Sequence, residues 1–165
     1  MERNQSRNNR DNRNNRSNDR RNQGQQFQNR QSQQSRPQPE SINPLLLPED
    51  YVKEAEDIIL KEEWFRRITT SKIRRLFSLL IDSYNLESIY TDKTLKPETV
   101  RQLHLAQIRM LYEAGRDKNV KAFLESTKLV HYLKAIKDDH DAFINYFHYM
   151  EALVAYHKYF GGKEA

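Results

Sequence analysis

The segment from Tyr146 to Gly162 reads YFHYMEALVAYHKYFGG and constrains the fold more than any other part of the chain. It is apolar or aromatic at nearly every position and lacks the polar face that a surface helix shows. A helix of this composition has to be surrounded by other helices, so we expect it to be the central one of a bundle. We also expect its Tyr and His side chains to reach the bundle surface with their polar tips.

The charged residues divide the chain into two parts. Residues 1–40 contain nine arginines, no lysine and four acids, whereas the remaining residues carry 19 basic and 19 acidic side chains. Phe27 is the only large apolar residue of the first part after the initial methionine. A segment with so little apolar surface cannot offset its ordering entropy. We therefore expect a disordered tail and linker over residues 1–48 and one helical domain over residues 49–165.

The arginines of the tail allow two interpretations. Arg7, Arg10, Arg13 and Arg16 recur at every third position. A flexible cation of this kind binds RNA without sequence preference by displacing counterions. A tail of low sequence complexity can equally serve for solubility or be dispensable. The sequence leaves both roles open.

Several functional classes are disfavoured by what the sequence lacks. It contains no apolar run long enough for a signal peptide or a membrane span, so we expect a cytoplasmic protein without membrane contact. It has no cysteine, which excludes disulfides and thiolate zinc sites. A glycine-rich phosphate loop is also missing, which argues against the usual nucleotide-binding folds.

Helix start and stop signals divide the folded part into five segments. The first predicted helix runs over about 49–62 and the second from Thr70 past Tyr84. The third begins at Pro97 and ends at Gly115, the fourth runs from Asp117 to about 137, and the fifth runs from the acidic residues 138–141 to the glycines 161 and 162. Thr70 is expected to cap the second helix, and Gly115 to end the third in the left-handed conformation. No alternating stretch predicts a strand. The expected fold is all-α, an antiparallel bundle of about five helices. The leucines 45–47 before the first helix are expected to dock onto it.

A first group of candidate binding residues surrounds the start of the second helix. Five bases and no acid occur in residues 66–75, namely Arg66, Arg67, Lys72, Arg74 and Arg75. At about 100° per residue, Arg74 and Arg75 fall opposite the face that Ile73 buries, together with two serine hydroxyls, those of Ser71 and Ser78. Guanidinium groups beside hydroxyls suit contacts with a phosphate backbone. An ordinary solvated helix face is the alternative.

A second group lies around the turn between the third and fourth predicted helices. It consists of Arg116, Lys118 and Lys121. Backbone N–H groups at the start of the fourth helix would add to its attraction for phosphate, although Asp117 opposes it. Conventional charges at two helix ends would explain the same residues.

The histidines do not assemble a convincing catalytic or metal site. His148 and Glu151 are three positions apart on one helix, and the stretch from Asp138 to Asp141 contains His140 between acids. Metal-dependent phosphohydrolases collect further ligands from several helices, and the other histidines here lack acidic neighbours. We therefore interpret these residues as capping or core polar groups. No nucleophile stands beside a base, so we predict no catalytic residue, metal ligand or cofactor.

Three ordered motifs carry a resemblance to a known family. They are TTSKIR at residues 69–74, YEAGRD at residues 112–117 and YMEALVAYHKYFGG at residues 149–162. Together with residues 128–136, they resemble the small, all-helical subunit of the type III-A CRISPR effector, the Csm complex. The resemblance covers residues 49–164 and leaves the tail out. Because three motifs occur in order, it is more specific than any one motif alone.

The resemblance implies a non-catalytic subunit present in several copies. These copies would stack head to tail along the guide RNA beside a repeated backbone subunit, and contact the backbone of the target RNA paired with the guide. It also implies that RNA cutting belongs to the backbone subunit and DNA cleavage to the large polymerase-like subunit. By motif position, Lys72, Arg74 or Arg75, and Arg116 would contact RNA. Leu79 is a candidate for contact between copies.

A rival interpretation is a free-standing helical adaptor that binds protein partners. The adaptor would lose any RNA affinity once residues 1–40 are removed. A cationic surface on the folded part would keep some RNA affinity.

Overall fold

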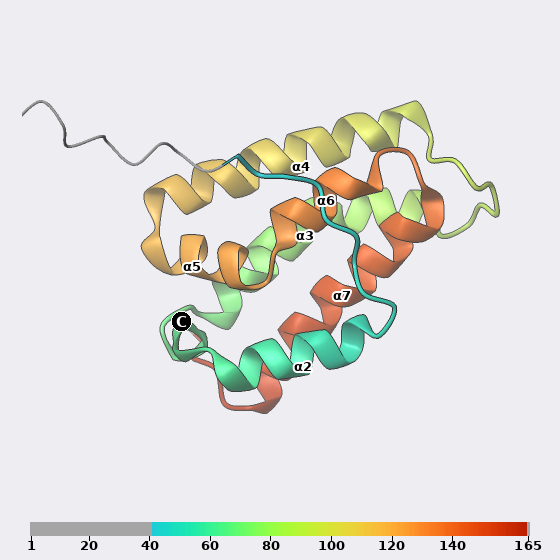
Figure 1. Cartoon of the computed structure of the whole chain (residues 1–165). Coiled ribbons are helices and arrows are strands. Elements are labelled where there is room, and N and C mark those ends of the chain that lie inside the picture. The colour runs from blue at the N-terminus through green and yellow to red at the C-terminus, as the bar shows by residue number, and fades with distance from the viewer. Residues whose placement is uncertain (1–40, 165) are drawn as a thin grey trace, which may run out of the picture. The chain divides into compact units, whose positions relative to one another are not determined.

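The computed structural model describes residues 41–164, which form a bundle of helices (Figure 1). The elements in chain order are α2 (Tyr51–Lys61), the 3-10 helix η1 (Glu63–Arg66), α3 (Thr70–Glu87), α4 (Pro97–Arg116), α5 (Lys118–Ser126), α6 (Leu129–Ile136) and α7 (His140–Tyr159). Within the described residues there are two isolated β-bridges and no named strand. The predicted all-α fold is therefore confirmed, while the tail over residues 1–40 lies outside the described part.

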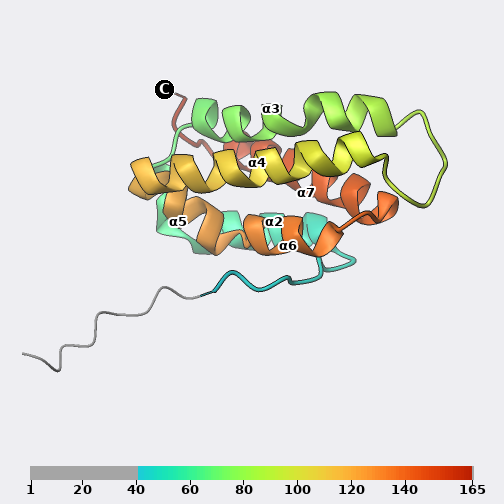
Figure 2. The ribbon, with the colours of Figure 1, turned by 90° about the horizontal axis from the view of Figure 1, so that it is seen from above.

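Helix α7 is the central element, as its sequence predicted. It packs against α2, α3 and α6. Figure 2 shows α3 along one side of the bundle and α2 with α6 along the other, with α7 running between them. The α4 helix contacts α3, α5 and α6 and forms an outer layer. No helix among residues 41–164 is both long and apolar enough to cross a membrane.

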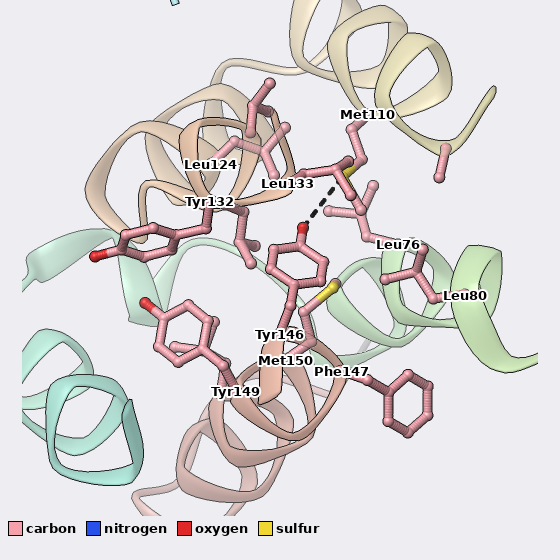
Figure 3. Packing of buried hydrophobic residues seen from close by; sticks show 14 of the residues in the cluster. Leu76, Leu80, Met110, Leu124, Tyr132, Leu133, Tyr146, Phe147, Tyr149 and Met150 are labelled. Carbon is pink, nitrogen blue, oxygen red and sulfur yellow. Dashed lines mark hydrogen bonds between the residues drawn. The ribbon is translucent and has the colours of Figure 1, made fainter. Parts of the chain in front are cut away.

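Two of the four tyrosines of α7 lie inside the bundle, so the expectation that their tips reach the surface is wrong for these two, while Tyr159 is exposed. Tyr146 and Tyr149 are almost fully buried. The Tyr149 hydroxyl donates to the Thr127 carbonyl at 2.9 Å, and the Tyr146 hydroxyl points at the sulfur of Met110 (Figure 3). Burial raises the pKa of both phenols far above the ordinary value. The polar tips are therefore satisfied by partners in the core rather than by water.

The fourth predicted helix is in fact two helices. It breaks at Thr127 and Lys128, where Lys128 has a left-handed φ of 54°. The Thr127 hydroxyl donates to the Phe123 carbonyl at 2.6 Å, and the Thr127 carbonyl accepts from Tyr149. A hydrogen bond from another helix thus takes the place of a bond within the helix. No glycine or proline lies at this break, so the sequence did not predict it.

Two predicted helix ends are displaced by one or two residues. Thr69, rather than Thr70, caps α3 and accepts from the Lys72 N–H at 3.2 Å. Gly115 lies inside α4, which continues to Arg116, so it does not end the helix in the left-handed conformation. Asp117 ends α4 with an extended backbone and caps α5, as predicted. The extended backbone at Asp117 ends α4 where Gly115 was expected to end it.

The segment before α2 crosses α6. The Leu45 N–H donates to the His131 carbonyl at 3.1 Å, and His131 Nδ1 lies 2.8 Å from the Asn43 carbonyl that accepts from it. Leu47 packs against the core, whereas Leu46 is 81% exposed. Of the leucines expected to dock, only Leu47 packs against the core.

Candidate nucleic-acid interface

The orientation of α3 follows from its apolar residues. Ile73, Leu76 and Leu80 are buried, which leaves Arg74 and Arg75 exposed on the opposite side. This is the arrangement that the spacing predicted. Leu79 is partly buried and packs against the core, so it is less exposed than its position on α3 predicted, and its contact with another copy stays a prediction.

The C-terminal segment holds the first turn of α3. The Thr70 N–H donates to the Lys163 carbonyl at 2.7 Å, and the Ser71 N–H donates to the Glu164 carbonyl at 3.4 Å. The Ser71 hydroxyl also donates to Glu164, at 2.9 Å. These donors at the start of α3 are therefore occupied by the chain itself. Ser78 donates to the Arg75 carbonyl, so neither serine hydroxyl offers its proton to phosphate in this arrangement.

Buried His157 joins three segments around this turn. Its Nε2 lies 2.9 Å from the Phe65 carbonyl, and its Nδ1 lies 3.1 Å from the Thr70 hydroxyl. Because a carbonyl only accepts, Nε2 carries the proton and Nδ1 accepts from Thr70. Burial lowers the pKa of His157, which favours the neutral ring. His157 thus fixes η1 and the first turn of α3 from within the bundle.

The two groups of cations predicted from the sequence meet on one surface. Lys72 Nζ of α3 lies 2.5 Å from Asp117 Oδ2 at the end of α4. Arg75 Nη2 lies 3.5 Å from Glu113 Oε1, and Arg116 Nη1 lies 3.8 Å from the same oxygen. We call the surface formed by Lys72, Arg75 and Arg116 the cationic face.

The acids of this surface lie deeper than the bases. The side chains of Arg75 and Arg116 are 73% and 61% exposed, against 23% for Glu113 and 25% for Asp117. The hydrogen bond from Lys72 is the main reason that the pKa of Asp117 lies below its ordinary value. Ion pairs this exposed contribute little to stability. The guanidinium groups therefore remain accessible to a ligand from solvent.

The sequence did not single out Glu113 as part of this surface. Glu113 binds Arg75, which lies on another helix and 38 positions earlier. The only local signal is its spacing of three residues from Arg116 on α4, and such pairs are common on exposed helices. The role of Glu113 becomes visible only when α3 and α4 are packed together.

The remaining predicted cations lie in different local surroundings. Arg66 stands 6.0 Å from the ring of Phe65, and Arg67 pairs with Glu63 at 3.6 Å. Lys121 pairs with Glu125 at 3.7 Å. Within residues 41–164, Arg74 and Lys118 form no ion pair, and no contact joins them to the cationic face.

The start of α5 is not open to an anion, contrary to the expectation from its N–H groups. Asp117 Oδ1 accepts from the N–H groups of Asn119 and Val120, at 2.8 and 3.4 Å. The carboxylate satisfies these donors and adds a negative charge beside them. Any anion bound here has to be held by side chains.

The acidic stretch with His140 serves the helix start and the core. Asp139 Oδ1 accepts from the Ala142 N–H at 2.9 Å and caps α7. His140 is buried, and its Nε2 lies 3.1 Å from the Glu87 carbonyl. His148 Nε2 lies 3.2 Å from the Tyr84 hydroxyl. Over residues 41–164, no three His, Asp or Glu side chains gather in a way that could hold a metal ion.

Comparisons with known proteins identify the family. Residues 47–163 match the family described as Csm2 Type III-A. A CRISPR system Cms protein Csm2 of Streptococcus thermophilus is 35% identical over 125 residues, which cover 73% of this chain and 98% of that protein. The protein of the same description from Mycobacterium tuberculosis (strain CDC 1551 / Oshkosh) is 32% identical over 121 residues, covering 72% of this chain and 98% of the relative.

A third relative of the same description, from Enterococcus italicus, is 33% identical over 98 residues. That alignment covers 58% of this chain and 70% of the relative. The family match spans the whole bundle from before α2 to the segment that holds α3, and it includes the cationic face. The chain therefore belongs to the Csm2 Type III-A family, the small subunit of the type III-A CRISPR effector complex.

Proposed function

We propose that this subunit binds the backbone of the target RNA paired with the guide RNA, without reading its sequence, through the cationic face. The single observation that carries this proposal is the convergence of Lys72 and Arg75 of α3 with Arg116 of α4 on one exposed surface. Arg66, Arg67, Arg74, Lys118 and Lys121 are further candidates that lie near these cations in the sequence. A subunit that follows RNA of any sequence needs spaced cations and no pocket for base edges.

We propose that the subunit is not an enzyme. Its buried histidines are engaged with carbonyl groups, His157 with Phe65 and His140 with Glu87. The charged groups of the cationic face can bind and orient a phosphate but provide no activated nucleophile. The chemistry of the complex would then fall to the backbone subunit and the large polymerase-like subunit, which are the proposed protein partners together with further copies of this chain.

Contact between copies is proposed to use the outer surface of α4. Leu105, Ile108 and Tyr112 are exposed and lie on one face of that helix, with Arg101 and Arg109 beside them. Large exposed apolar side chains in a row mark a protein-binding surface. We call these five residues the α4 row.

The α2 side of a neighbouring copy fits the α4 row in charge and length. Residues 49–63 carry seven acids and two lysines, and Val52 and Leu60 are exposed among them. Val52 and Leu60 span about 12 Å along α2, close to the roughly 10 Å from Leu105 to Tyr112. In Figure 1, α4 and α2 lie on opposite sides of the bundle. Two different complementary surfaces allow copies to stack as a filament.

The proposed RNA contact is tested by reversing the three converging charges. Lys72→Glu, Arg75→Glu and Arg116→Glu are introduced together, and the affinity of the assembled complex for target RNA is measured at several salt concentrations. Each lost phosphate contact should reduce the slope of log affinity against log salt by roughly 0.7–0.9. The loss should be the same for unrelated targets paired with their matching guides.

A variant with Lys93→Glu, Lys96→Glu and Lys137→Glu provides a control with the same change of net charge, at positions outside the cationic face, the α4 row and α2. If the control weakened RNA binding as much as the test variant, or if the loss depended on the target sequence, the cationic face would not be the RNA-binding surface. Circular dichroism checks that both variants remain folded.

A further inference from the structure

The cationic face is held in ion pairs by two acids that come from the same end of α4. Glu113 Oε1 contacts both Arg75 and Arg116, and Asp117 Oδ2 contacts Lys72. All three cations of the cationic face are therefore paired with an acid at the end of α4 before any ligand binds. A phosphate group has to displace these carboxylates or share the cations with them.

The pairing between α3 and α4 is not a by-product of local helix spacing. Lys72 and Asp117 are 45 positions apart, and their ion pair is at the same time a hydrogen bond from Nζ to Oδ2 of 2.5 Å. The other carboxylate oxygen of Asp117 caps α5, which fixes this acid in place. Glu113 is held by the helix on which it lies, one turn before Asp117. The fold thus positions both carboxylates next to the cations with which they pair.

We propose that Glu113 and Asp117 determine the selectivity of the cationic face by lowering its intrinsic affinity for RNA. This inference rests on the proposed function. A single copy gains little from an RNA strand, because each new phosphate contact replaces an existing ion pair. Several copies in a row bind the same RNA backbone together, and the small binding free energies of the copies add. Once one copy holds the RNA, the next copy meets it at a high effective concentration. The acids thereby favour RNA already held in the complex over free RNA.

The size of the effect follows from the strength of exposed ion pairs. A pair of this kind changes an equilibrium by about two- to fivefold. Removing the negative charge of one acid should therefore raise the affinity of a single copy for RNA by about two- to fivefold. Removing both should raise it by roughly four- to 25-fold if the two effects are independent.

The test uses the isolated full-length chain with Glu113→Gln and Asp117→Asn. Both substitutions keep the shape of the side chain, and Asn is as good a cap for α5 as Asp. The affinity for an unstructured RNA is measured at several salt concentrations. We expect tighter binding and a steeper salt dependence than in the wild-type chain, because cations freed from acids neutralise phosphates more fully.

A matched control removes two acids elsewhere on the same two helices. Asp82→Asn on α3 and Glu98→Gln on α4 change the net charge equally, and Asp82 lies about 10 Å along the helix from Arg75. The tail is present in all variants, so its contribution to RNA binding cancels. If the test variant bound RNA no more tightly than this control, or more weakly than wild type, the inference would be wrong.

A third variant shows whether a negative result contradicts only this inference or also the proposed function. The two neutral substitutions are combined with Lys72→Glu, Arg75→Glu and Arg116→Glu, and in this background they should gain no more affinity than the control pair does. If charge reversal alone left RNA binding unchanged, the proposed function would fail together with the inference. If charge reversal weakened binding but the neutral substitutions did not strengthen it, only the role of the two acids would be rejected.

Discussion

Gly162 lies directly against the imidazole ring of His157. A β-carbon at position 162 would come within 2.2 Å of His157 Cε1, and the Gly162 N–H donates to the His157 carbonyl at 2.8 Å. The chain can therefore turn back onto α3 at this point only because residue 162 has no side chain. This contact brings Lys163 and Glu164 to the first turn of α3.

Gly162→Ala should destabilise the bundle. The methyl group would push the His157 ring away from Phe65 and Thr70, and overpacking of this kind costs about 1–3 kcal/mol. Gly115→Ala is the matched control, because nothing lies within 4 Å of the added carbon and the residue is inside α4. The control should gain about 0.5–1 kcal/mol. Denaturant unfolding of both variants measures the difference, and equal stabilities would contradict the packing.

His157 and His140 should influence the pH dependence of stability in opposite directions. The pKa of His157 is lowered by burial, so the unfolded chain takes up a proton more readily and stability falls as the pH drops below about 6.5. The pKa of His140 is raised, chiefly by its hydrogen bond to the Glu87 carbonyl. Its contribution is complete below about pH 6.5 and is lost as the pH rises through the folded pKa.

His157→Gln and His140→Gln test this contrast. The stability difference between wild type and His157→Gln should be larger at about pH 7.5 than at about pH 5.5, and the reverse should hold for His140→Gln. Unfolding free energies at the two pH values provide the measurement. The same sign for both variants would show that one of the two assigned hydrogen-bond patterns is wrong.

Tyr149→Phe should destabilise the protein through the break between α5 and α6. It removes the donor to the Thr127 carbonyl, and Thr127 is fully buried. A buried carbonyl left without a partner costs about 1–3 kcal/mol. Tyr159→Phe, at a position that is 81% exposed, should have almost no effect. Thermal unfolding of the two variants distinguishes a specific bond from a general loss of hydroxyl groups.

Charge reversal on the α4 row should reduce the number of copies in the assembled complex. Arg101→Glu with Arg109→Glu would face the acids of α2 in the proposed neighbour and repel them. Glu49→Lys with Glu56→Lys in the same chain should restore the copy number, whereas either pair alone should lower it. Native mass spectrometry of the complex counts the copies. If the combined variant showed no recovery, α2 would not be the surface that faces the α4 row.

The central helix and the all-α class could be predicted from the sequence because both depend on local patterns. An apolar segment such as residues 146–162 has only one stable place in a small helical protein, between other helices. The exposure of Arg74 and Arg75 follows in the same way from the spacing of Ile73, Leu76 and Leu80. The roles of the cations in RNA binding stay predictions.

Other features depended on contacts between residues distant in the sequence. The break at Thr127 requires the hydroxyl of Tyr149, and the first turn of α3 requires the C-terminal segment beside His157. Likewise, the meeting of Arg75 with Arg116 depends on how α3 packs against α4. Periodicity determines which face of a helix is buried, but the packing of all the helices together decides which exposed faces become neighbours. The sequence by itself therefore determined the helices and their charges, and only the tertiary structure decided that two separate groups of cations form one surface with two acids beneath them.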